Sequence, residues 1–283
     1  MPETLVRLGE LLREARSVLH EAGVAEAARE SRFLWESVGG GAPDRYQDPA
    51  CAVDAALAGH YAVQVERRRQ GEPLAYVTGA AGFRRLGLLA DRRALIPRPE
   101  TEGLVDLLLQ RAGTGIVADL GTGSGCLALS LADEGRFSRV IAVDRSREAL
   151  ALAAENVRRT GLGLSLVVGD WLSPLAGATL DAIVSNPPYL TVDEYERLDP
   201  AVRAWEPAAA LVSGVDGLAA TRELLRSAPA VLRPGGWIAM ELDCRRAESS
   251  AALAAATGWQ SVTIEHDLFG RARYLLAQRS DRQ

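Results

Sequence analysis

The segment Ser185-Asn186-Pro187-Pro188-Tyr189 combines one amide, two prolines and one aromatic ring directly after an apolar run. Proline lacks a backbone N–H and fixes its own φ, and Pro187 also restrains Asn186 to extended geometry. In such a stiff loop, Asn186 Oδ1 and the Pro187 carbonyl can accept two hydrogens while Tyr189 covers a π face. The loop therefore suits a neutral NH2 group. The alternative is a proline turn in which Tyr189 only packs.

A second segment, Asp119-Leu120-Gly121-Thr122-Gly123-Ser124-Gly125, has the glycine spacing of a cofactor loop. Glycines permit unusual φ values and let the backbone approach a ligand closely. Nicotinamide enzymes and S-adenosylmethionine methyltransferases share such loops, but the dinucleotide fingerprint requires Gly or Ala where this chain has Cys126. The spacing favours a methyltransferase without settling it. The loop residues that we expect to bind the cofactor are Gly121, Thr122, Gly123, Ser124 and Gly125.

Two further strand ends carry residues suited to a nucleoside. Asp144 ends the next apolar run, where an acid can hold both ribose hydroxyls. Asp170 and Trp171 end the run after that, where they can flank an adenine ring. Asp144 alone could cap the following helix instead, and Trp171 alone could only pack. Because three strand ends coincide in order, we predict that Asp144, Asp170, Trp171 and Asn186 also contact the cofactor.

The elements that must position these residues alternate between strands and helices from residue 115 onward. Short apolar runs at residues 116–120, 140–143, 164–168, 180–185 and 237–242 read as strands, with helical patterns at 126–133, 147–159 and 221–231. This alternation predicts an α/β fold with a doubly wound, mostly parallel sheet, whose ligands lie off the carboxyl ends of the strands. All four candidate segments fall at that edge.

The first part of the chain has a different pattern. Residues 1–72 show apolar residues at helical spacing, which predicts a small helical bundle. Residues 73–97 contain strand-like pieces at 76–78 and 85–89 separated by glycines, which predicts a β-hairpin linker. Residues 98–283 form the third part, and Thr101 opens its first helix. The linker and residues 97–102, including Arg98, could shape a groove for a protein substrate.

Composition limits the classes of function. The chain has 283 residues, a net charge of −5, and arginine but no lysine, which excludes a lysine Schiff base or a phosphate-loop lysine. The acidic balance does not favour nonspecific nucleic-acid binding. The three cysteines and three histidines are scattered, so neither a disulfide framework nor a metal site is indicated. We expect a soluble, cytoplasmic protein, since neither a signal-peptide core nor a membrane-length apolar run is present.

The order of these motifs resembles the peptide chain release factor glutamine methyltransferases over nearly the whole chain. The likeness rests on residues 71–76, 95–102, 121–125, 183–189, 205–211 and 214–218. It implies a Rossmann-like class I methyltransferase domain that uses S-adenosyl-L-methionine to methylate N5 of the glutamine in the Gly-Gly-Gln motif of release factors. The partners would be release factors, with neither direct nucleic-acid contact nor a membrane. The resemblance also implies that the helical domain, residues 1–72, serves substrate recognition. The stretch Met240–Cys244 departs from the family pattern, which usually has a more glycine-containing turn and a glutamine there.

The resemblance also implies roles for single residues. Asn186, Pro187 and Tyr189 would be catalytic, and Pro188 would join them in binding the substrate amide. Two other enzymes remain as alternatives, a glutamine methyltransferase of a ribosomal protein and an adenine-N6 DNA methyltransferase. The second usually needs a flipped base and a basic DNA-binding face. A catalytically silent binding module and a nicotinamide oxidoreductase are disfavoured by the intact motifs and by Cys126.

Overall fold

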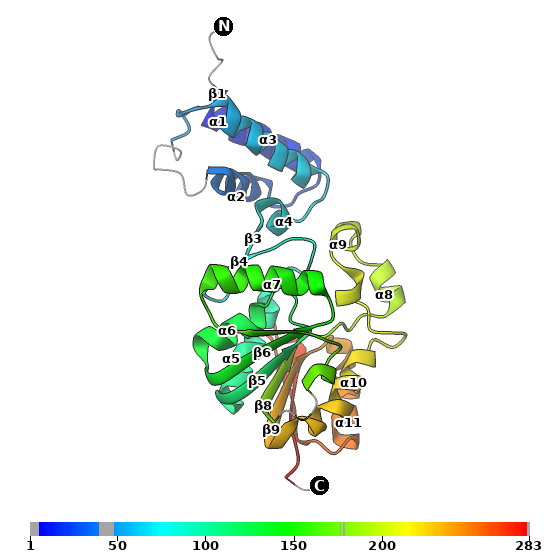
Figure 1. Ribbon diagram of the computed structural model, residues 1–283. Coiled ribbons are helices and arrows are strands. Elements are labelled where there is room, and N and C mark those ends of the chain that lie inside the picture. The colour runs from blue at the N-terminus through cyan, green and yellow to red at the C-terminus, as the bar shows by residue number, and fades with distance from the viewer. Residues whose placement is uncertain (1–5, 40–47, 176, 178, 282–283) are drawn as a thin grey trace. The chain divides into compact units, whose positions relative to one another are not determined.

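The computed structural model describes residues 6–39, 48–175, 177 and 179–281 (Figure 1). The chain divides into two compact units, residues 1–80 and 81–283.

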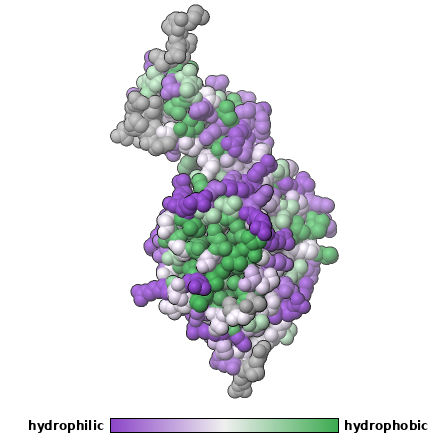
Figure 2. Space-filling model, viewed as in Figure 1, coloured by the Kyte–Doolittle hydropathy of each residue, from purple (hydrophilic) through white to green (hydrophobic). Residues whose placement is uncertain are grey.

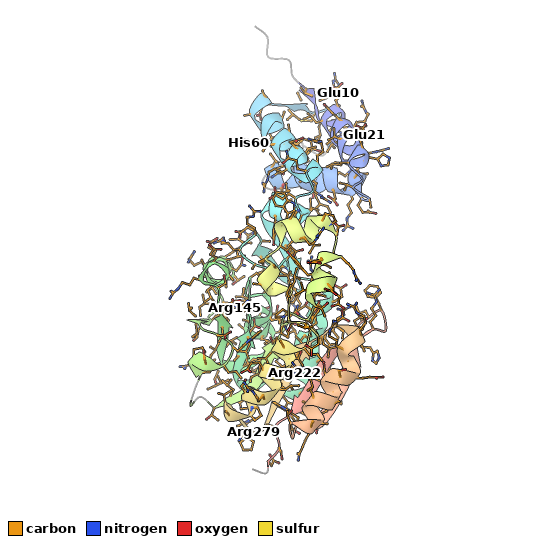
Figure 3. All side chains as sticks on the ribbon, turned by 90° about the vertical axis from the view of Figure 1, so that its right-hand side faces the viewer. Glu10, Glu21, His60, Arg145, Arg222 and Arg279 are labelled. Carbon is orange, nitrogen blue, oxygen red and sulfur yellow. The ribbon has the colours of Figure 1, made fainter. Side chains whose placement is uncertain are left out.

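The first unit is a helical bundle with a small strand pair. Its elements are β1 (Val6–Arg7), α1 (Leu8–Glu21), α2 (Ala27–Gly39), β2 (Ala52–Val53), α3 (Ala55–Arg69) and α4 (Leu74–Thr78). The apolar faces of the helices meet in one core, in which Trp35 of α2 packs edge-on against Tyr61 of α3 at 5.5 Å between ring centroids. Glu10 and Glu21 of α1 and His60 of α3 are exposed, as Figure 3 shows.

The prediction of a strand at residues 76–78 is wrong, because these residues lie in α4. Pro73 precedes the helix as its N-cap, and Gly79 ends it in the left-handed conformation with φ of 70°. A single helical turn contains too few residues for its period to be told from that of a strand. The hairpin itself is present, formed by β3 (Ala80–Phe83) and β4 (Leu86–Leu89).

The second unit is built on a sheet with seven strands among the described residues, in the order β10-β11-β9-β8-β5-β6-β7. Its strands are β5 (Thr114–Leu120), β6 (Arg136–Asp144), β7 (Ser165–Val168), β8 (Leu180–Ser185), β9 (Leu232–Glu241), β10 (Gln260–His266) and β11 (Ala272–Gln278). Strands β5 to β9 pair in parallel, whereas β11 is antiparallel to both of its neighbours. The predicted doubly wound, mostly parallel sheet is confirmed.

Helices cover both faces of this sheet. One face carries α5 (Glu102–Arg111), α6 (Cys126–Glu134) and α7 (Arg147–Thr160), and the other carries α10 (Ala219–Ser227) and α11 (Ala247–Ala256). Each face of the sheet packs against its helices in a separate hydrophobic cluster, and successive strand residues point to opposite faces. Val117 of β5 belongs to the cluster with α5 and α6, and the next residue, Ala118, belongs to the cluster with α10 and α11. The remaining helical turns are η2 (Pro99–Thr101), η3 (Ser173–Leu175), α8 (Val192–Glu196), α9 (Pro200–Trp205), η4 (Ala208–Ala210), η5 (Ala228–Ala230) and η6 (Cys244–Arg246).

Sheet order also brings the candidate residues together. Strand β5 lies between β8 and β6, so the loops that follow these three strands, beginning at Asn186, Gly121 and Asp144, stand side by side at one edge. Below α7, Figure 2 shows hydrophobic residues gathered on the viewed face of the second unit. In the described part of the chain, all helices are too short or too polar to cross a membrane.

Candidate active site

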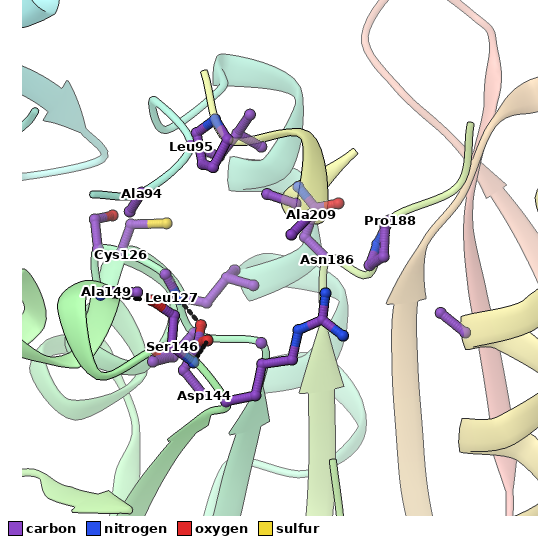
Figure 4. Close-up of a pocket in the computed structure, with 18 of the residues that line it drawn as sticks. Ala94, Leu95, Cys126, Leu127, Asp144, Ser146, Ala149, Asn186, Pro188 and Ala209 are labelled. Carbon is purple, nitrogen blue, oxygen red and sulfur yellow. Dashed lines mark hydrogen bonds between the residues drawn. The ribbon is translucent and has the colours of Figure 1, made fainter. Parts of the chain in front are cut away.

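A pocket of about 400 Å³ opens at the carboxyl edge of the parallel strands. Of the residues predicted from sequence, those that line it are Gly121, Thr122, Gly123, Ser124, Asp144, Asp170, Trp171, Asn186 and Pro188. Figure 4 shows Asn186 and Pro188 on one side of the space and Asp144 with Ser146 on the other. Gly125, Pro187 and Tyr189 lie next to lining residues in the chain but are not part of the wall.

The glycine loop takes a shape that other residues rarely adopt. Gly121, Gly123 and Gly125 have φ values of 71°, 55° and 84°, in the left-handed region. The N–H groups of Gly121 and Thr122 both donate to the carbonyl of Val143, which ties the loop to β6. A Cβ at Gly121 would lie 3.4 Å from the Trp171 ring and fill the pocket there. The three glycines therefore leave the loop backbone uncovered, so that a ligand can approach it closely.

Asp144 connects the glycine loop to the start of α7. One carboxylate oxygen accepts from Gly123 N at 2.9 Å, and the other accepts from Ser146 N at 2.8 Å. The N-cap of α7 is Ser146, whose hydroxyl accepts from Ala149 N, so Asp144 is not the cap. A carboxylate has about four acceptor sites. Asp144 can thus accept two hydroxyl hydrogens from a ligand while it holds both loops.

Trp171 lines the pocket and has a strained backbone conformation. Its φ of 45° is left-handed, which is uncommon for a bulky residue and is tolerated where the surroundings enforce it. The ring packs against the core beneath β5 and β6 and stands beside Gly121. Together with the exposed Asp170, it offers a flat apolar surface next to an acceptor, which suits a purine ring.

Asn186 stands where β8 ends, and its amide orientation follows from a hydrogen bond. Its Nδ2 donates to Thr101 Oγ1 at 3.0 Å, which turns Oδ1 away from Thr101. The hydroxyl of Tyr189 donates to Glu241 Oε1 at 3.4 Å, and burial raises the pKa of Tyr189 above its ordinary value. The loop thus holds an acceptor at the pocket and a protonated phenol beside it.

Residues 97–102 with Arg98 were expected to shape a groove for a protein substrate, but the residues predicted to bind the cofactor left out one wall of the pocket. It consists of residues 93–98 with Thr101, and of Pro207, Ala209, Ala210 and 212–214. The two stretches are joined by Arg98 Nη2, which donates to Glu206 Oε1 at 2.5 Å, and by Ile96 N, which donates to Glu206 Oε2 at 3.3 Å. The Glu206 side chain is 2% exposed. Arg98 is thus fixed as the partner of a buried acid, a role for which its sequence context gave no signal.

Asp119 gives the fold a dependence on pH. It is fully buried, Oδ2 accepts from Thr122 Oγ1 and Ala128 N, and Oδ1 has no hydrogen-bond partner among the described residues. Burial raises the pKa of Asp119 to about 7. Between about pH 4, the ordinary range of an aspartate, and pH 7, the folded state therefore binds a proton that the unfolded state has released. Stability falls as pH rises through this range.

We predict that the ligand-free protein melts lower at pH 8.5 than at pH 6, and that Asp119→Asn, which cannot ionise, weakens this dependence. The difference between the two proteins should be at least about 3 °C. Melting followed by circular dichroism at both pH values measures it. Parallel curves for the wild type and Asp119→Asn would show that Asp119 ionises normally.

Two family models match the chain. Residues 100–200 match the methyltransferase small domain, and residues 10–79 match the PrmC N-terminal domain. A release factor glutamine methyltransferase from Cereibacter sphaeroides is 38% identical over 279 residues, covering 96% of this chain and 99% of the relative. One from Deinococcus radiodurans is 38% identical over 288 residues, covering 97% and 99%.

Solved structures show the same fold. A methyltransferase from Pyrococcus furiosus matches with a TM-score of 0.52 and 21% identity, covering 68% of this chain and 88% of that one. A Thermus thermophilus 16S rRNA N2 G1207 methyltransferase, solved in complex with AdoMet and guanosine, matches with a TM-score of 0.50 and 20% identity, covering 71% and 49%. The expected class I methyltransferase architecture is confirmed.

Proposed function

The chain belongs to the release factor glutamine methyltransferases, and from that membership we propose that it methylates N5 of the glutamine in the Gly-Gly-Gln motif of release factors. One observation carries the proposal: Asn186 presents an amide oxygen at the rim of a pocket built for a nucleoside. A hydrogen-bond acceptor at that place receives an N–H from a substrate amide.

The methyl donor is S-adenosylmethionine, and the pocket fits its parts. Asp144 has acceptor capacity for the ribose hydroxyls, the left-handed glycines open the backbone to the ligand, and Trp171 with Asp170 offers a surface for adenine. When bound, the cofactor supplies an electrophilic methyl group on a sulfonium. The residue roles proposed here are those predicted from sequence, with Gly125 acting through the loop.

An amide nitrogen is a poor nucleophile because its lone pair is delocalised into the carbonyl. We propose that Asn186 Oδ1 and the Pro187 carbonyl accept the two hydrogens of the substrate NH2 and aim its nitrogen at the methyl group. These acceptors stabilise the positive charge that develops on nitrogen. Pro188 and Tyr189 confine the amide plane. As the N–C bond forms, the sulfur–methyl bond would break and its electron pair would stay on sulfur. The N–H becomes acidic in the same step and would lose its proton to water afterwards, so a titrating base is unnecessary before transfer.

The family membership does not favour the alternative substrates, a ribosomal protein or DNA. A net charge of −5 also gives no general attraction to nucleic acid. We propose that the partners are release factors without direct nucleic-acid or membrane contact, and that the enzyme works in the cytoplasm, where release factors act on ribosomes. We also propose that the helical domain predicted from sequence, residues 1–72, helps to recognise the release factor.

The direct test is to incubate the purified protein with S-adenosylmethionine and each bacterial release factor, and to map methylation by peptide mass spectrometry. We expect one added methyl on the glutamine of Gly-Gly-Gln and none when that glutamine is replaced by alanine. Cofactor binding without a methyl on any release factor would contradict the proposed substrate and direct the search to ribosomal proteins.

A further inference from the structure

A line of hydrogen bonds runs from Asn186 into the protein core. Asn186 Nδ2 donates to Thr101 Oγ1 at 3.0 Å, and Thr101 Oγ1 donates to Glu241 Oε2 at 2.6 Å. Thr101 is 2% exposed and Glu241 is 1% exposed. The two residues come from η2 and from the end of β9, far from Asn186 in the sequence. They form a buried support beneath the loop after β8.

The chemistry of this line allows one direction only. An ionised carboxylate accepts hydrogen bonds and cannot donate, so the Thr101 hydroxyl must give its hydrogen to Glu241. The oxygen of that hydroxyl is then left as an acceptor, and Asn186 must offer its NH2 to it. An amide turned by 180° would place Oδ1 against the hydroxyl oxygen, with two acceptors facing each other. It would also present NH2 to the substrate, where an acceptor is needed.

Glu241 also contacts Tyr189, the second functional side chain of the loop after β8. Its other oxygen, Oε1, accepts from the Tyr189 hydroxyl at 3.4 Å and lies 3.8 Å from Arg273 Nη1. Arg273 is itself fixed by Asp267, whose Oδ2 accepts from Arg273 Nε at 2.9 Å. A single buried carboxylate therefore sets the orientation of both Asn186 and Tyr189.

We propose that Thr101 and Glu241 are positioning residues that determine which way the Asn186 amide faces, an inference that rests on the proposed methyl transfer to an amide. Thr101 does not touch the substrate in this scheme. Because the Thr101 hydroxyl donates to the buried carboxylate of Glu241, it can only accept from Asn186, and Asn186 is the side chain that contacts the substrate.

The charge of Glu241 then controls activity. A protonated Glu241 can donate to Thr101, which reverses the line and stabilises the turned amide. Burial raises the pKa of Glu241, opposed by the Thr101 hydrogen bond and by Arg273. Activity should therefore fall with decreasing pH, beginning at a higher pH than an exposed glutamate would give. The charged and titratable groups near Glu241 are Glu100, Cys126, Tyr189, Arg273 and Tyr274.

The test compares Thr101→Val, which keeps the shape and removes the hydroxyl, with Thr101→Ser, which keeps the hydroxyl. Thr101 makes no side-chain capping bond to α5, so valine does not cost a cap. We expect Thr101→Val to lower kcat by about 10- to 100-fold. The cofactor Kd and the release factor KM should change less than about threefold, and Thr101→Ser should restore most of kcat. Glu241→Gln should also lower kcat and abolish the decline at low pH.

A second readout does not depend on the substrate. The chain has two asparagines, Asn156 and Asn186, and Asn156 Nδ2 donates to the carbonyls of Leu89 and Ser124 as an internal reference. In protein labelled with 15N-asparagine, Thr101→Val should shift the Asn186 side-chain NH2 signals and speed their exchange with water, while those of Asn156 stay unchanged.

The outcomes separate the two hypotheses. Wild-type protein that methylates no release factor, but shows the change at Asn186 in Thr101→Val, would leave the positioning role supported and the substrate assignment wrong. An active wild type together with a Thr101→Val variant of unchanged kcat and unchanged Asn186 signals would overturn the positioning role.

Discussion

Replacing Asn186 by alanine should lower kcat for methyl transfer by about 10²- to 10³-fold, the range seen when one preorganised hydrogen-bonding group is removed from a transition state. The variant loses the acceptor for the substrate NH2, which matters most as positive charge develops on nitrogen. Asn186 is only one of the proposed cofactor contacts, and Asp144 and the glycine loop lie on other strands, so the cofactor Kd should rise by less than about threefold. Single-turnover methylation and calorimetric titration of the cofactor measure the two quantities.

A matched control is Asp193→Ala, an exposed substitution in α8 a few residues beyond the loop. It should leave both constants unchanged. Asn186→Asp adds a sharper comparison, because aspartate keeps acceptor oxygens but cannot donate to Thr101, whose hydroxyl already serves Glu241. We expect this variant to be impaired as well. Near-normal turnover by Asn186→Ala would mean that the substrate amide is held elsewhere.

The sequence was sufficient to predict the residues that end strands. Gly121, Asp144, Trp171 and Asn186 each follow a short apolar run, and runs that alternate with helices place their ends at one edge of a parallel sheet. The predicted strands and helices of the second unit therefore placed these residues at the edge of the sheet where the pocket lies. The strand predicted at 76–78 was wrong because one turn of helix has too few residues to reveal its period.

The residues that support the site could not be predicted in this way, because their positions depend on register between strands. Ser185 at the end of β8 pairs with Met240 of β9, and Asn186 and Glu241 are the residues that follow this pair. Thr101 of η2 connects these two residues, because its hydroxyl accepts from Asn186 and donates to Glu241. Glu206 is buried and accepts hydrogen bonds from Arg98 and from the Ile96 backbone, which are more than 100 residues away in the sequence. The sequence shows two acids in Met240–Cys244, Glu241 and Asp243, but does not specify what either side chain contacts.

Replacing Asp144 by alanine should weaken S-adenosylmethionine binding by about 100-fold, which corresponds to about 2.8 kcal/mol. The variant loses charge-assisted hydrogen bonds to the ribose, each worth about 1.5–3 kcal/mol. It also releases Gly123 N and Ser146 N, whose common acceptor holds the glycine loop against the start of α7. Calorimetric titration with S-adenosylmethionine and with S-adenosylhomocysteine gives the affinities.

The affinities of both ligands should fall to a similar extent in Asp144→Ala, because they share the ribose and differ only at the sulfur, in its methyl group and positive charge. At saturating cofactor, kcat should remain within about threefold of the wild type, since Asn186 lies on the opposite side of the pocket and keeps its contact with Thr101. This is the reverse of the pattern expected for Asn186→Ala, in which kcat falls and affinity holds. An Asp144→Ala variant that binds both ligands as tightly as the wild type would show that the ribose is held by other groups.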